Sequence, residues 1–404
     1  MISKDFFKAG HTPTLFSAFL YFDMSFMVWV LLGALGVQIA KTLGLTPAEK
    51  GFMVAVPILA GAGLRLVNGL LVDRIGPKKT GTIAQGIVIA GLLLAFLLHI
   101  NSYGGVLALG IVLGMAGASF AVALPLASRW YPPKYQGIAL GIAGAGNSGT
   151  VLASLFAPTL AKMFGWTAVF GLVAIPLIIT FIIYQCLAKD APDQPPAKTW
   201  AQYLNIFKQS DAWWFLLFYG VTFGGFVGLS SSLNIYFNSE YGIDPVKAGF
   251  FTAACVFAGS LLRPVGGGLA DRIGGIRTLS IMYSVAAVAL IILSFGMPTI
   301  WTSVAVLIVA MGALGMGNGA VFQLVPQRFR NDMGIMTGLV GMFGGVGGFY
   351  LAASLGLSKQ ATGSYQFGLI GFAILAMVAL GGLSMVKKRW RGTWQAFGAA
   401  DAKL

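Results

Sequence analysis

Charge, cysteine and histidine are all scarce in this chain of 404 residues. Asp, Glu, Lys and Arg together make up 9% of it, whereas a soluble domain carries about 25%. The two cysteines, Cys186 and Cys255, give neither a disulfide framework nor metal-site spacing. The two histidines, His11 and His99, stand near the ends of apolar runs and form no nucleophile–base constellation. We therefore expect no catalytic residue, no metal site and no cofactor, which argues against an enzyme.

Apolar residues dominate the chain instead. They make up 57% of it, and the mean hydropathy is +0.83. A helix that spans a bilayer needs roughly 20 mainly apolar residues. Twelve such runs are centred near residues 28, 60, 89, 117, 148, 176, 224, 258, 287, 313, 346 and 375. The pattern predicts an all-α membrane protein with twelve transmembrane helices surrounded by the lipid bilayer.

The basic residues are divided unevenly between the predicted loops. With the N-terminus placed inside, 19 of the 26 Lys and Arg residues fall in inner segments, five in outer segments and two within the membrane. Inner loops rich in Lys and Arg mark the cytoplasmic side. We therefore predict a multi-pass protein of the cytoplasmic membrane with both termini in the cytoplasm. The net charge of +14 follows from this topology, so we expect no nucleic-acid partner.

One long polar connection, which contains three prolines, joins the sixth and seventh apolar runs. It divides the chain into two halves of six helices. We predict an N-terminal half over 1–188, a cytoplasmic linker over 189–211, a C-terminal half over 212–386 and a basic cytoplasmic tail over 387–404. Transporters commonly contain such repeats and bind substrate near the midplane between them.

The halves share a repeated segment at a constant offset of 198 residues. Arg65 and Arg263 each stand eight residues before an Asp-Arg-Ile-Gly sequence, at 73–76 and 271–274. The longer pattern Gly-x-Leu-x-Asp-Arg-x-Gly resembles the loop motif of the major facilitator superfamily, which recurs after helices two and eight. This resemblance implies two pseudo-symmetric six-helix halves. It also implies a role in gating and assembly for the charged residues of the motif, which are Asp73, Arg74, Asp271 and Arg272.

Arg65 and Arg263 themselves lie inside apolar runs. A charge at mid-membrane costs about 2.5–3.5 kcal/mol even on the lenient insertion scale, so such residues usually face a polar cavity on a substrate path. Asp23 is the only acidic residue well inside a run, so two cations with at most one carboxylate favour an anionic substrate. Planar guanidinium groups bind an oxyanion with two parallel hydrogen bonds. The alternative is that each arginine pairs with a backbone carbonyl or a helix C-terminus as a structural contact.

Two glycine-rich strings occupy the fifth and eleventh runs, at 141–149 and 338–348. Small residues let membrane helices approach closely, so packing explains most of these glycines. Asn147 differs, because an amide in an apolar setting needs a partner. It can donate to an oxyanion or bind the backbone. Bare backbone can also offer N–H groups to the same anion, and the candidate positions are Gly144, Gly146, Gly344 and Gly345.

The strings also carry a closer resemblance. Gly-x-x-Gly-x-Gly-Asn-x-Gly around Asn147 resembles the first nitrate signature of the nitrate/nitrite porter family, and 338–348 resembles the second. Arg65 and Arg263 match the family's pair of substrate arginines in helices two and eight. The resemblance implies transport of nitrate and/or nitrite by alternating access, with the two arginines clamping the anion and Asn147 orienting it.

Aromatic residues extend this resemblance. Tyr219 and Phe223 match the family's Tyr-x-x-x-Phe in helix seven, whose rings line the substrate slot, and Phe120 is a weaker match to the ring that faces it. A ring on each flat face of a planar anion restricts the slot to thin substrates. Core or lipid-facing packing is the usual role of such residues, and only the arginines and the family match argue otherwise.

Asp23 departs from the family's exchangers, for which the resemblance implies a cavity without protonatable groups. It is therefore a candidate for proton coupling, in which substrate and proton bind together. The alternative is that Asp23 joins the first helix to a neighbour, for example near Arg129. Two rival functions also stay open: a carrier for another small anion such as oxalate or formate, and a nitrate sensor that does not transport. We expect a monomer.

Overall fold

The computed structural model describes residues 4–192, 199–329 and 332–393, and every regular element within them is a helix. The N-terminal half contains α1 (Lys4–Ala9), α2 (Thr12–Trp29), α3 (Leu31–Ala34), α4 (Gly36–Leu43), α5 (Pro47–Ile75), α6 (Pro77–Leu97), α7 (Tyr103–Gly117), α8 (Phe120–Ser128), α9 (Pro133–Gly144), the short 3₁₀ helix η1 (Ala145–Ser148), α10 (Gly149–Phe164) and α11 (Trp166–Leu187). After α12 (Trp200–Ile206), the C-terminal half contains α13 (Ser210–Tyr241), α14 (Pro245–Ile273), α15 (Gly275–Ser294), α16 (Ile300–Arg328), α17 (Met333–Thr362) and α18 (Gln366–Thr393).

Eleven helical stretches of the described chain are long and apolar enough to cross a membrane. Two of them are composite, because α7 and α8 form one stretch and α9, η1 and α10 form another. The first predicted span is interrupted at Val30 and Leu35, which separate α2, α3 and α4. With this interrupted span counted, the predicted all-α fold of twelve transmembrane helices is confirmed.

The Asp-Arg-Ile-Gly repeat forms the same turn in both halves. Gly76 follows α5 with φ +88°, and Gly274 follows α14 with φ +97°. Glycine adopts this region readily, whereas a residue with a Cβ does not. The next helices, α6 and α15, begin directly after these glycines. The repeat in the sequence is therefore also a repeat in the backbone.

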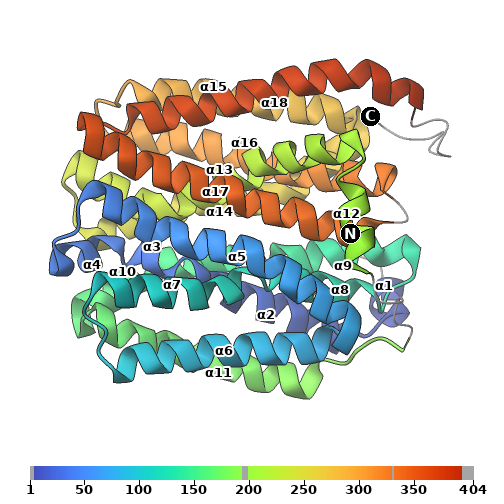
Figure 1. Cartoon of the computed structure of the whole chain (residues 1–404), viewed down its shortest axis with the longest axis horizontal. Helices are drawn as coiled ribbons and strands as arrows, with labels where there is room; N and C mark the ends of the chain where they lie inside the picture. The colour runs from blue at the N-terminus through green and yellow to red at the C-terminus, as the bar shows by residue number, and fades with distance from the viewer. Residues whose placement is uncertain (1–3, 193–198, 330–331, 394–404) are drawn as a thin grey trace.

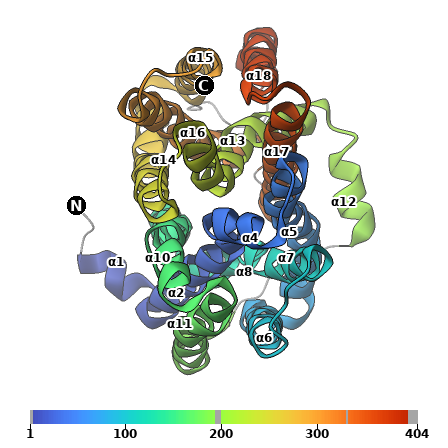
Figure 2. The same ribbon diagram turned by 90° about the vertical axis from the view of Figure 1, so that its left-hand side faces the viewer.

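The long helices run side by side along one axis of the molecule (Figure 1). α1, α12 and the last turn of α18 lie at one end, which we call the terminal end, and the opposite end is the far end. Figure 2 looks onto the far end and shows α2–α11 in one group and α13–α18 in another. At the boundary between the groups, α5 packs against α17 and α10 packs against α14.

The two halves make close backbone contact at the far end. A Cβ added to Gly51 of α5 would lie only 2.8 Å from the Cα of Gly356 in α17. Between α13 and α3, Asn234 Nδ2 donates a hydrogen bond of 2.5 Å to Ala34 O. The far end is therefore closed by direct contact between the N-terminal and C-terminal halves.

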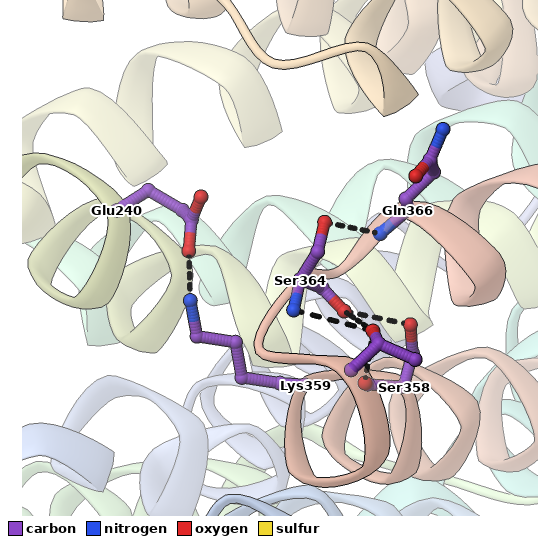
Figure 3. A network of polar contacts seen from close by, with 6 residues as sticks. Glu240, Ser358, Lys359, Ser364 and Gln366 are labelled. Carbon is purple, nitrogen blue, oxygen red and sulfur yellow. Dashed lines mark hydrogen bonds and ion pairs between the residues drawn. The ribbon is translucent and has the colours of Figure 1, made fainter.

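Polar contacts hold the far end of α17 in place. Lys359 Nζ lies 2.5 Å from Glu240 Oε1 of α13 (Figure 3). In the turn into α18, Ser358 Oγ donates to Ser364 O at 2.7 Å, and the backbone N of Gln366 donates to Ser364 Oγ at 3.1 Å. These bonds join α13, α17 and α18, so the C-terminal half presents a fixed surface to α5.

At the terminal end, ion pairs join helices of the same half. Asp73 of α5 lies 3.0 Å from Arg129, the residue that follows α8. In the other half, Asp211 at the start of α13 accepts hydrogen bonds from three side chains, which are Arg328 Nε (2.7 Å), Trp390 Nε1 (2.8 Å) and Arg389 Nη2. Each cluster therefore stabilises one half as a unit.

The predicted domain boundaries can be compared with the helices. α11 ends at Leu187, just before the predicted linker 189–211, and α13 begins at Ser210, within the last two residues of that linker. α12 lies within this linker, whereas residues 193–198 lie outside the described residues. Burial of Tyr203 in α12, together with the nearby Asp73 carboxylate, raises its pKa to about 12. α18 continues to residue 393, so the predicted tail 387–404 begins as helix, and residues 394–404 lie outside the described residues.

Candidate functional site

Arg65 is buried in the middle of the molecule, with 1% of its surface exposed. Its Nε donates to Gly117 O at 3.0 Å, and its Nη1 donates to Gly341 O of α17 in the other half. The Gly117 carbonyl is available because the chain turns between α7 and α8, where Ala121 N donates to Ala118 O instead. The Nη2 of Arg65 has no hydrogen-bond partner among the described residues. The alternative of a carbonyl contact is thus realised for part of the guanidinium, and one nitrogen is left for a ligand.

Arg263 of α14 is partly buried, and its buried Nη1 also has no partner among the described residues. Neither it nor Arg65 belongs to any of the ion pairs found between described residues. Both guanidinium carbons face the same ring, because they lie 6.0 Å (Arg263) and 5.5 Å (Arg65) from the centre of Phe120. Two cations thus converge from opposite halves without a carboxylate to neutralise them.

Aromatic rings line the space around these cations. Tyr219 and Phe223 of α13 stack with ring centres 5.1 Å apart and an interplanar angle of 5°. The Cζ of Arg65 lies 5.0 Å from the centre of the Phe223 ring. The Tyr219 hydroxyl is buried beside the Arg263 side chain, and it makes no hydrogen bond of good geometry among the described residues. The structure therefore brings together five residues expected from the sequence, which are Arg65, Arg263, Phe120, Tyr219 and Phe223.

Further contacts come from residues that the sequence reasoning missed. Phe322 of α16 contacts Tyr219 edge-on, with ring centres 5.1 Å apart, and its ring centre lies 5.6 Å from the Cζ of Arg263. Trp29 of α2 lies 5.3 Å from the Cζ of Arg65. Aromatic residues make up 13% of the chain, and no spacing rule distinguishes a ring that faces a cation from one that faces lipid. Such positions therefore cannot be identified from the sequence.

Asn147 lies in η1, within the interrupted fifth span. It is fully buried, and neither Oδ1 nor Nδ2 has a hydrogen-bond partner among the described residues. η1 packs against α2 and also against α14, the helix that holds Arg263. An unpaired buried polar group costs about 1–3 kcal/mol, and the role of Asn147 as a ligand stays a prediction.

Asp23 of α2 lies beside the same helix η1. Ser148 Oγ donates to Asp23 Oδ1 at 2.7 Å. Arg129 bonds to Asp73 at the terminal end, whereas Asp23 joins α2 to the neighbouring η1 through the Ser148 hydroxyl. None of the ion pairs found between described residues includes Asp23.

The four glycines named from the sequence have different surroundings. Gly344 allows close packing, because an added Cβ would lie 2.8 Å from the rings of Tyr219 and Phe223. Gly146 similarly packs on Phe22, and Gly345 packs on Ala62. Around Gly144, by contrast, an added Cβ would meet no atom within 4 Å. Open space is therefore found beside Gly144, and the other three let the helices approach.

The charged residues of the repeated loop motif are not all alike. Asp73 is bonded to Arg129 in the N-terminal half. Arg74, Asp271 and Arg272 are exposed at the terminal end. None of the four lies among the residues around Arg65 and Arg263, which agrees with an expected role away from the substrate. Their part in gating stays a prediction.

Comparisons with known proteins cover most of the chain. The model of the Major Facilitator Superfamily matches residues 17–352. A "Nitrite extrusion protein" of Bacillus subtilis is 33% identical over 362 residues, which cover 89% of this chain and 90% of that protein. A probable nitrate/nitrite transporter of Mycobacterium tuberculosis is 33% identical over 366 residues, covering 88% and 91%. A probable nitrate/nitrite antiporter of Thermus thermophilus is 30% identical over 393 residues, covering 89% and 88%.

Solved structures share the fold at lower identity. A bacterial homologue of the human lysosomal transporter Spinster, in an inward-facing and occupied conformation, superposes with a TM-score of 0.70 and 16% identity. The match covers 93% of this chain and 97% of that one. At this identity, the likeness extends to the arrangement of the helices alone.

Proposed function

The chain belongs to the Major Facilitator Superfamily and, within it, to the nitrate/nitrite porter family, and from this membership we propose that it carries nitrate, nitrite or both across a membrane by alternating access. The observation that carries the proposal is the pair of arginines. Arg65 and Arg263 come from opposite halves, face one aromatic ring and have no carboxylate partner among the described residues. Two uncompensated cations in an apolar interior favour an anion.

The remaining groups suit a small planar oxyanion. Arg65 Nη2, Arg263 Nη1 and Tyr219 Oη are buried donors without partners in the described part of the chain. Nitrate and nitrite are flat and singly charged, and both present an edge of two oxygens to a guanidinium group. Asn147 orients the anion. The rings of Tyr219, Phe223 and Phe120 restrict the slot to thin, planar substrates. Bound anion thus satisfies donors that otherwise stay unpaired.

Alternating access uses the contact between the halves. In this structure the far end is closed where Gly51 meets Gly356 and where Ala34 meets Asn234. We propose that the halves rock about the arginine site, so that the far end opens as the terminal end closes. The excess of Lys and Arg in the inner loops assigns the terminal end to the cytoplasm. The protein works as a monomer in the cytoplasmic membrane.

Coupling depends on Asp23. Among the described residues, its carboxylate bonds to the Ser148 hydroxyl and to the backbone beside it, at Gly149. An anion that binds nearby favours protonation of such a carboxylate, because it offsets the field of the arginines. Proton and anion then bind together, as in symport. The competing mode is exchange of nitrate for nitrite without protons.

The test is flux in proteoliposomes that contain the purified protein. Proteoliposomes loaded with nitrite or with nitrate, with and without a pH gradient, should take up labelled nitrate faster than liposomes without the protein. Competition by formate and oxalate separates this function from that of a carrier for other small anions. Absence of nitrate and nitrite flux, with rapid formate or oxalate flux, would contradict the proposed function.

A further inference from the structure

A second buried amide, besides Asn147, lies in the C-terminal half of the molecule. Asn318 belongs to α16, in the C-terminal half, and is fully buried. Neither its Oδ1 nor its Nδ2 has a hydrogen-bond partner among the described residues. Buried polar groups without partners destabilise the fold, so a purely structural role does not explain why they are present.

Helix packing fixes the direction in which Asn318 points. On one side of α16, Gly315 and Gly319 pack closely against the backbone of α14 at Gly259 and Arg263. On another side, Gly317 presses on Thr222 of α13. A helix turns by about 100° per residue, so position 318 lies on the face between these two contacts. That face looks into the space between α13 and α14.

Phe322 shows what occupies this space. It is four residues after Asn318, so both lie on the same face of α16. The Phe322 ring lies 5.6 Å from the Cζ of Arg263, 5.1 Å from the ring of Tyr219 and 5.8 Å from the ring of Phe120. Asn318 stands one turn, about 5–6 Å, further toward the far end. It therefore borders the arginine and aromatic cluster from the C-terminal half.

The duplication of the chain gives an independent placement. The offset of 198 residues pairs Asn318 with Phe120. This register holds locally, because Asn68 Nδ2 bonds to Ala118 O in one half and its counterpart Gly266 presses on Met316 O in the other. Phe120 faces both guanidinium groups. The pseudo-two-fold relation directs position 318 toward the same pair.

We infer that Asn318 is a second amide ligand of the transported anion and that it favours nitrate over nitrite. The inference rests on the proposed function. Nitrate carries a third oxygen where nitrite has only a lone pair on nitrogen. A donor in addition to the two arginines and Asn147 can therefore form a hydrogen bond to this third oxygen in nitrate, which nitrite does not have. An amide donor at this place stabilises the larger anion without adding charge.

The test compares two buried asparagines. Asn318→Leu keeps the branched shape of the side chain and removes the amide. We expect unfolding without anion at the same or a higher temperature, because an unpaired polar group is gone. Nitrate affinity, measured from the rise in unfolding temperature and from proteoliposome uptake, should fall roughly tenfold to a hundredfold. Nitrite affinity should change by less than about threefold, because the variant removes no donor that nitrite uses. Asn318→Ala repeats the test with a smaller side chain.

Asn68→Leu is the matched control, because the Nδ2 of Asn68 already bonds to Ala118 O. It should unfold at a lower temperature and keep the ratio of nitrate to nitrite affinity. If both Asn318 variants keep the wild-type ratio, or unfold earlier than the wild type without anion, Asn318 is structural and the inference is wrong. If the wild type binds neither anion, the proposed function fails first and the inference fails with it.

Discussion

At the scale of single residues, the interior is marked by polar groups that the protein itself does not satisfy. Buried amides, hydroxyls and guanidinium groups normally find partners. Here Asn147, Asn318, Tyr219 and the two arginines each keep a buried atom without one among the described residues. These residues come from both halves of the chain. We propose that a bound oxyanion accepts hydrogen bonds from their donors.

The shape of the guanidinium group should matter as much as its charge. Arg65 already uses Nε and Nη1 on two carbonyls, so only a group with several donors can also hold an anion. Lysine has one compact ammonium and cannot reproduce this arrangement. Arg65→Lys and Arg263→Lys should each lower nitrate uptake roughly tenfold to a hundredfold at equal protein amount. Arg277→Lys, at an exposed position of α15, is the control. If both site variants take up nitrate as fast as this control, the two arginines do not clamp the anion.

The role of Asp23 can be separated from that of the anion site. Asp23→Asn mimics the protonated form and keeps a hydrogen bond to Ser148 possible. We expect this variant to exchange nitrate for nitrite at the wild-type rate and to lose the part of uptake that a pH gradient drives. Uptake is measured in proteoliposomes with and without the gradient. Full gradient-driven accumulation by the variant would leave Asp23 a structural residue.

At the scale of helices, glycine decides where the halves can meet. In membranes, association depends on close packing of small residues. The Gly51–Gly356 contact brings α5 and α17 so close that even one methyl group on Gly51 would meet Gly356 Cα at 2.8 Å and Ala352 O at 3.1 Å. Both obstacles are backbone atoms, which cannot rotate away. The closed far end thus depends on two positions without side chains.

Gly51→Val should keep the far end open. Overpacking costs about 1–3 kcal/mol, which shifts an open–closed equilibrium roughly tenfold to a hundredfold, so transport should fall. In a Cys186→Ser background, a cysteine placed at the buried Ser231 should react faster with maleimide in the Gly51→Val protein. Gly63→Val on the same helix has open space around the added carbon and should leave both readouts at the wild-type level. Equal labelling rates in the two valine variants would show that the glycine contact is not the gate.

At the scale of the whole molecule, two halves with their own internal ion pairs meet around a cationic centre. Asp73–Arg129 stabilises one half and the Asp211 cluster stabilises the other. Arg65 reaches across the boundary to Gly341 O. We expect a molecule built in this way to move as two units, with the site between them exposed to one side at a time.

The orientation of these units in the membrane can be tested directly. Asn101 and Asn205 are both exposed, at the far end and in α12 respectively. The uneven distribution of Lys and Arg places α12 in the cytoplasm. In intact cells and a Cys186→Ser background, an impermeant maleimide should label Asn101→Cys at least about tenfold faster than Asn205→Cys. The reverse order of labelling would invert the proposed topology.

The sequence by itself determined the class, the repeat and the two arginines. Long apolar runs report helices because every backbone group in lipid must be bonded within its own segment. A charge inside such a run is conspicuous because it is costly. The match of Arg65 to Arg263, eight residues before identical tetrapeptides, needed no coordinates. Asn147 was visible for the same reason, as an amide in an apolar string.

Only the tertiary structure decided which side chains share the site and how its groups are bonded. Phe322, Trp29 and Asn318 come from separate helices, and their directions depend on helix packing rather than on local spacing. The carbonyls of Gly117 and Gly341 hold Arg65 because two distant turns of the chain face it. Asp23 accepts a hydrogen bond from Ser148, since η1 places a hydroxyl beside it. These are contacts over long sequence distances, and no local pattern of residues encodes them.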